Sequence, residues 1–139
     1  MRPVGLAVAA LALVAAACAG ATPEHLPDTS ISTSLGVLTG TDAENMMAGI
    51  CDLERGPDLQ EANTIFYGRV HERLHVLAAA AAKDDRATAG ALLQAKEKVE
   101  QDLAGPALPA SFGDDAAALE AAARRALVSI KWPGLTCNS

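Results

Sequence analysis

The sequence predicts an all-α fold, a small antiparallel bundle of about four helices, on two observations. Along four segments between residue 41 and the C-terminus, apolar residues recur at spacings of three and four, which is the period of one helix face. Outside residues 22–40, no stretch alternates β-branched or aromatic residues with polar ones as a strand does. With the N-terminal segment set aside, about 100 residues remain, enough for one small domain.

The first helix is expected from Thr41 to about Arg55. Thr41 and Glu44 have the spacing of a capping box, in which each side chain accepts a hydrogen bond from the other residue's backbone N–H. Gly56-Pro57 ends the helical pattern. The apolar positions of this segment are Ala43, Met46, Met47, Ile50 and Leu53.

A second helix is expected over residues 58–83 and a third from Asp85, as its N-cap, to about Ala104. The connection between them is so short that the two helices should form an antiparallel hairpin. Ile65 and Val76 lie opposite the apolar stripe of the second helix, so a further helix or a partner should cover that side. The stripe itself consists of Leu59, Ala62, Phe66, Val70, Leu74, Leu77 and Ala81.

The fourth helix should begin at Ser111 or Asp114 and end before Trp132-Pro133-Gly134. Arg124 and Arg125 lie late in this segment, where cations favour the helix dipole, and no partner is needed to explain them. The stripe of this helix consists of Leu119, Ala122, Ala126, Leu127 and Ile130.

The first 21 residues have the features of a secretory signal peptide. Met1-Arg2 supplies a positive start, and Pro3 to Ala17 is uncharged and mostly apolar. About 14 apolar residues are too few to span a bilayer as a helix. Residues 22–40 contain prolines and a Thr/Ser cluster and are expected to form a flexible tether to a bundle domain at residues 41–139.

Two cleavage routes fit this leader. Ala15-Ala16-Ala17-Cys18-Ala19-Gly20 resembles the signal sequence of bacterial lipoproteins, which is cut before a cysteine that carries lipid. This resemblance implies that Cys18 is lipidated and that the protein is held on a membrane. The alternative is ordinary signal-peptidase cleavage near Ala21.

The chain contains three cysteines, an odd number that needs explanation in an exported protein. If Cys18 carries lipid, Cys51 and Cys137 are left to pair. A disulfide between them would tie the end of the chain to the first helix.

The charge balance argues against a nucleic-acid partner. Removing the leader up to Cys18 deletes Arg2 and no acid, so ten Lys and Arg face seventeen Asp and Glu, a formal charge of −7. Phosphate binding needs a basic surface. The expected location is the cell envelope, on the outer face of the membrane or in the periplasm. The expected partners are the membrane, through the lipid, and an unknown envelope protein.

One motif suggests different chemistry. His71-Glu72-Arg73-Leu74-His75 resembles the H-E-x-x-H of zinc peptidases at these five residues, which implies two zinc ligands and a glutamate that polarises a metal-bound water. The glycine and third histidine of the extended motif are replaced by Ala78 and Ala81.

Three functions therefore follow from the sequence. The first is a non-catalytic exported helical protein that acts by contact with an envelope component and needs no cofactor. The second is a bundle that binds zinc or copper through His71 and His75, with Glu97 of the third helix as the candidate third ligand. Glu100 lies one turn further along that helix, and the first helix offers Met46, Met47 and Asp52 as other candidates. A zinc peptidase is the third and most distant one.

Overall fold

A computed structural model describes residues 30–137, which fold into four helical rods and a short β-hairpin. The second rod is continuous but changes its helical form twice. The helices are α1 (Gly40–Glu54), α2 (Leu59–Ile65), η1 (Phe66–Val70, a π-helix), α3 (His71–Ala81), α4 (Arg86–Leu103) and α5 (Phe112–Ser129). The predicted helical bundle is thus confirmed, and "all-α" is an approximation to it.

The hairpin lies in the segment that was expected to be a tether. Strands β1 (Ser30–Thr33) and β2 (Gly36–Thr39) pair antiparallel. Ile31 and Leu38 are cross-strand partners, Leu38 is fully buried, and Ile31 packs against the core. The Ser/Thr-rich composition suggested a loop, but these residues alternate with apolar ones, which is the pattern of a half-buried strand. The flexible tether is therefore wrong for residues 30–39.

The hairpin covers Val76, one of the two residues of the second rod for which a covering partner was expected. It packs on α3, and a Cβ on Gly36 would lie 3.5 Å from Val76 Cγ2. Lys83, just beyond α3, donates to the Ser32 carbonyl at 3.3 Å. Val76 is consequently only 8% exposed.

The capping box of helix α1 lies two residues earlier than expected, because it is formed by Thr39 and Asp42. The Asp42 N–H donates to Thr39 Oγ1 at 3.1 Å, and the Thr39 N–H donates to Asp42 Oδ2 at 3.2 Å. Thr39 ends β2 in an extended conformation, so the strand leads directly into the helix. The Thr41–Glu44 box is wrong for this reason.

The π-helical turn keeps the second rod's apolar residues on one face. Between Ala62 and Leu74 the stripe advances by four residues three times, which in an α-helix would rotate it by about 120°. In η1 the His71 N–H bonds to the Phe66 carbonyl, five residues back, and this widens the turn. Phe66, Val70 and Leu74 are all fully buried as a result.

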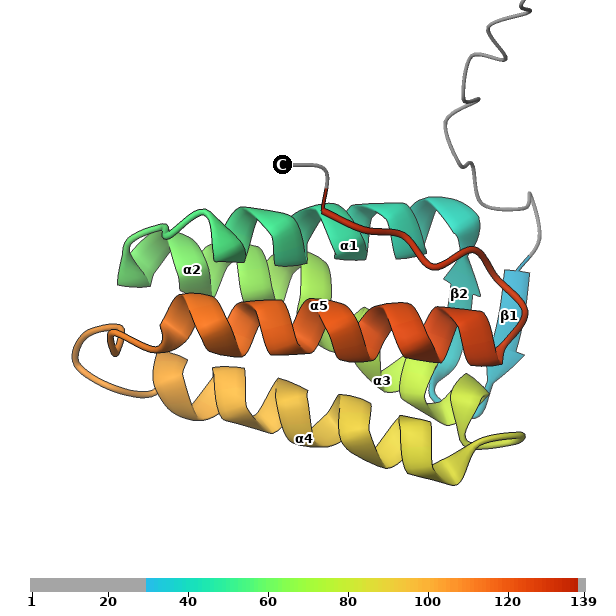
Figure 1. Ribbon diagram of the computed structural model, residues 1–139. Coiled ribbons are helices and arrows are strands. Elements are labelled where there is room, and N and C mark those ends of the chain that lie inside the picture. Colours follow the sequence, from blue (N-terminus) through green and yellow to red (C-terminus); the bar gives the residue numbers. More distant parts are fainter. Residues whose placement is uncertain (1–29, 138–139) are drawn as a thin grey trace, which may run out of the picture.

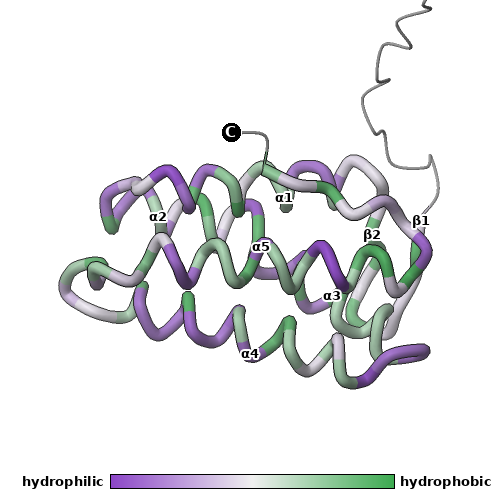
Figure 2. The backbone as a smooth tube through the Cα atoms, viewed as in Figure 1, coloured by the Kyte–Doolittle hydropathy of each residue, from purple (hydrophilic) through white to green (hydrophobic). Residues whose placement is uncertain are grey.

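The rods pack around one core. Helix α1 lies against η1 and α5, and α4 lies against α5 and α3, with the hairpin at one end (Figure 1). Hydrophobic and hydrophilic positions alternate along the rods (Figure 2), as expected of amphipathic helices. The predicted N-cap Asp85 is confirmed, because its side chain accepts a hydrogen bond from the Thr88 N–H. Helix α5 follows Ser111, one of its two expected starts, but the Ser111 side chain makes no cap hydrogen bond.

The chain reverses after α5 through a Schellman turn. Lys131 takes the left-handed conformation at φ 66°, its N–H bonds to the Val128 carbonyl, and the Trp132 N–H bonds to the Leu127 carbonyl. The tail then runs back along α1 (Figure 1).

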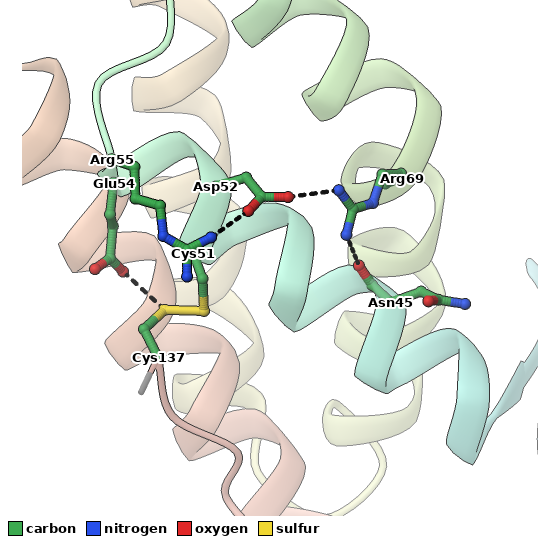
Figure 3. Close-up of polar contacts among 7 residues, drawn as sticks. All are labelled: Asn45, Cys51, Asp52, Glu54, Arg55, Arg69 and Cys137. Atoms are coloured by element: carbon green, nitrogen blue, oxygen red, sulfur yellow. Dashed lines mark hydrogen bonds and ion pairs between the residues drawn. A yellow bond between two sulfur atoms is a disulfide. The ribbon is translucent and has the colours of Figure 1, made fainter. Parts of the chain in front are cut away.

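The predicted disulfide between Cys51 of α1 and Cys137 of this tail is present, with the two Cα atoms 5.3 Å apart. Glu54 Oε1 lies 3.4 Å from Cys137 Sγ (Figure 3). Burial raises the pKa of Glu54, with the nearby charge of Glu120 acting in the same direction. The bond therefore lies beside a partly buried carboxyl group.

Gly49 sets the distance between α1 and the π-helical turn, and its substitution tests this contact. A Cβ on Gly49 would lie 2.8 Å from Val70 Cγ2 and 3.3 Å from Arg69 Cβ, whereas one on Gly90 meets nothing within 4 Å. Gly49→Ala should therefore lower the free energy of unfolding by about 1–3 kcal/mol. Gly90→Ala should raise it by about 0.5–1 kcal/mol. Urea denaturation of both variants measures this, and equal effects would contradict the close contact.

Candidate functional site

The H-E-x-x-H motif forms the start of α3, immediately after the π-helical turn. Single π-turns within α-helices are often found at functional sites. The His71 and His75 rings lie one turn apart, with centroids 4.9 Å from each other and planes at 79°. The Tyr67 ring lies 5.4 Å from that of His71. The two histidines thus share one side of the rod, as their spacing predicted.

Helix α4 supplies the polar groups that face this pair. His71 Nε2 lies 3.0 Å from Glu100 Oε1, and the other oxygen of Glu100 accepts a hydrogen bond from Lys96 Nζ at 2.7 Å. The Lys96 side chain is only 7% exposed, so burial of its charge is offset by this ion pair. His71, Glu100 and Lys96 therefore link α3 to α4 through a continuous polar chain.

The two histidines have different polar surroundings. His71 Nδ1 lies 3.2 Å from Glu72 Oε1, so each ring nitrogen of His71 lies near a carboxylate oxygen. Burial lowers the pKa of His75, and the nearby Lys96 ammonium group and His71 ring act in the same direction. The lowered pKa of His75 favours its neutral form, which is the form that binds a metal.

Glu97, the first candidate for a third ligand, does not lie against the histidine pair. Glu97 is exposed and accepts a hydrogen bond from Gln101, whereas Glu100, one turn further along α4, contacts His71. Among residues 30–137 there is no group of three or more His, Cys, Asp or Glu side chains already arranged to hold a metal ion. His71, His75 and Glu100 would have to move to share one.

The glutamate of the motif points away from the bundle. The Glu72 side chain is 82% exposed, and its contact is with the Nδ1 atom of His71. A zinc peptidase needs this carboxylate beside a water on the metal, so Glu72 would have to change its position to act in this way.

A second polar cluster joins α4 to α5, and the sequence analysis missed it. Lys98 Nζ lies 2.6 Å from Asp102 Oδ1 and 3.3 Å from Asp115 Oδ2. Burial opposes the charge of Asp115, yet hydrogen bonds from Ser111 and Lys98 and its contact with Asp102 lower its pKa. The Asp102 side chain is 5% exposed. The spacing of four between Lys98 and Asp102 was a signal for the local pair, but the contact with Asp115 depends on how the helices pack.

A third cluster joins α1 to η1 beside the disulfide (Figure 3). Arg69 Nη1 donates to Asp52 Oδ2 at 2.6 Å, and its Nη2 lies 3.5 Å from the Asn45 carbonyl. Arg55 donates to the other oxygen of Asp52. The π-helical turn thus brings Arg69 onto α1.

No protein-family model, curated protein or solved structure matches this chain. Within residues 30–137, no helix is both long and apolar enough to cross a membrane. Cys18, the predicted lipidation site, lies outside the described residues.

The lowered pKa of His75 predicts how stability changes with pH. The unfolded His75, with an ordinary pKa of 6.5, takes up a proton more readily than the folded one. The free energy of unfolding should therefore fall as the pH is lowered below about 6.5. Urea denaturation between pH 7.5 and 5.5 measures the slope, which His75→Gln should reduce. An NMR titration that places the pKa of folded His75 at or above 6.5 would contradict this.

Proposed function

We propose that this is an exported, lipid-anchored helical protein that acts by contact with another component of the cell envelope. The observation that carries the proposal is the Cys51–Cys137 disulfide, which joins positions 86 residues apart. Such bonds persist in oxidising compartments and are rare in the cytosol. The signal-like leader supports the same conclusion from a separate part of the chain.

The N-terminal leader also supports attachment of the protein to a membrane through a lipid. Cys18 stands at the end of the apolar run, in a sequence that resembles a lipoprotein signal. From Cys18 to Ser30 the chain can extend at most about 40 Å. A lipid on Cys18 would therefore hold the bundle close to the membrane surface, within reach of other envelope components.

Lipid attachment is tested by replacing Cys18. Cells grown with an alkyne-tagged fatty acid should label the wild-type protein and recover it in the membrane fraction. Cys18→Ser should lose the label and leave that fraction. The Cys51–Cys137 bond, measured by thiol alkylation, should form in the exported variant. An unmodified wild-type chain that begins after Ala21, detected by mass spectrometry, would overturn the anchor; a reduced Cys51 and Cys137 pair would overturn export.

A second candidate function is the binding of zinc or copper through His71, His75 and Glu100. The observation that favours it is the 3.0 Å approach of Glu100 Oε1 to His71 Nε2, beside a His75 ring only one turn away. Imidazole and carboxylate together suit zinc. The ion pair between Glu100 and Lys96 opposes it, because a metal would have to compete with this ammonium group.

The metal proposal is tested by titrating the processed, oxidised protein with Zn²⁺ and Cu²⁺ against a chromophoric chelator. We expect a dissociation constant below about 1 μM, weakened at least tenfold by His71→Ala or His75→Ala. Glu100→Gln should weaken binding, whereas Glu97→Gln, a matched change on the exposed side of α4, should not. Binding weaker than micromolar, or indifferent to both histidine variants, would exclude this function. The peptidase alternative would further require that Glu72→Gln abolish hydrolysis of an unstructured protein.

A further inference from the structure

A pocket of 490 Å³ lies where the start of α4, the end of α5 and the C-terminal tail meet. Its size falls in the range of small-molecule sites. It is remote in sequence from the histidine motif and shares no residue with it. The residues that line it include Asp85, Thr88, Arg124, Arg125, Val128 and Gly134.

Two neighbouring arginines give this pocket its charge. Arg124 and Arg125 are exposed, and neither makes a hydrogen bond or ion pair with another residue in the described part of the chain. Arg55, Arg69 and Arg73 each contact an aspartate. On a protein with an excess of acidic residues, two guanidinium groups at one pocket form a site suited to an oxyanion.

Most of the pocket surface is nevertheless apolar, and among the described residues Val128 is the one hydrophobic side chain that lines it. Val128 is 55% exposed. The backbone of Gly134 packs closely on Arg124 and Val128. A Cβ on Gly134 would lie 2.8 Å from Arg124 Cγ and 3.0 Å from Val128 Cγ2. The absence of a side chain at Gly134 therefore lets the tail lie across the hydrocarbon part of Arg124.

One acidic group opposes an anion here. Hydrogen bonds from the Thr88 hydroxyl and N–H lower the pKa of Asp85, so its carboxylate is charged at neutral pH. Because this carboxylate is held by Thr88 as the N-cap of α4, its position is fixed. It restricts the anionic group of a ligand to the arginine side of the pocket.

From the arginine pair, the apolar lining and the pocket volume, we propose that this pocket binds a small molecule that carries a carboxylate or phosphate group and a short apolar chain. The oxyanion pairs with Arg124 and Arg125, and the apolar chain lies on Val128. This site depends neither on a lipid at Cys18 nor on a metal at His71. A negative result for ligand binding here would therefore leave those two proposals unaffected, and a negative result for either of them would leave this one unaffected.

Binding is followed by NMR, through the amide chemical shifts of the residues that line the pocket. Hexanoate, hexyl phosphate, inorganic phosphate and hexylamine are titrated into the processed, oxidised protein. Saturable binding is expected for hexyl phosphate or hexanoate. Inorganic phosphate should bind at least tenfold more weakly than hexyl phosphate, and hexylamine should not bind.

Three variants locate the binding. Arg124→Gln combined with Arg125→Gln should weaken it at least tenfold. Asp85→Asn, which keeps a capping side chain and removes the opposing charge, should tighten it. Arg86→Gln removes one positive charge beside Asp85 outside the pocket and should change the affinity less than twofold. No saturable binding of either hexyl anion below about 10 mM, or equal weakening by Arg86→Gln, would overturn the proposal.

Discussion

The bond between Cys51 and Cys137 is the constraint on which the rest of this structure depends. Many of the buried residues are alanines, and alanine buries little area per residue. Closing a loop of this length is worth about 4–5 kcal/mol in the loop-entropy model, against about 5–15 kcal/mol for a whole domain. The bond also fixes the tail that follows α5, and this tail in turn forms one side of the pocket at Arg124.

Polar contacts between neighbouring rods supplement this core. Arg69 joins η1 to α1, His71 joins α3 to α4, and Lys98 joins α4 to α5. Partly exposed pairs such as Arg69–Asp52 contribute about 0–1 kcal/mol each. Their main effect is therefore on the register of the rods, because each pair fixes the position of one rod along its neighbour.

The helices could be predicted from the sequence because their apolar spacing is regular and Asp85 is a typical N-cap. The hairpin was missed because four-residue strands rich in Ser and Thr resemble a loop in composition. The π-helical turn had a signal, three successive spacings of four between Ala62 and Leu74, but a drifting stripe in a straight α-helix has the same spacing. Glu100 rather than Glu97 faces His71, since the level at which two rods meet depends on the turn between them.

The 86 residues between Cys51 and Cys137 have a consequence for the order of events in biogenesis. On the proposed export route the chain crosses the membrane N-terminus first, so Cys51 emerges well before its partner. The covalent loop cannot close until α1 to α5 have all crossed the membrane. Until then the alanine-rich helices lack their main restraint, which favours a chain that stays loose enough to be threaded. Oxidative maturation of this protein would thus be timed by the arrival of Cys137.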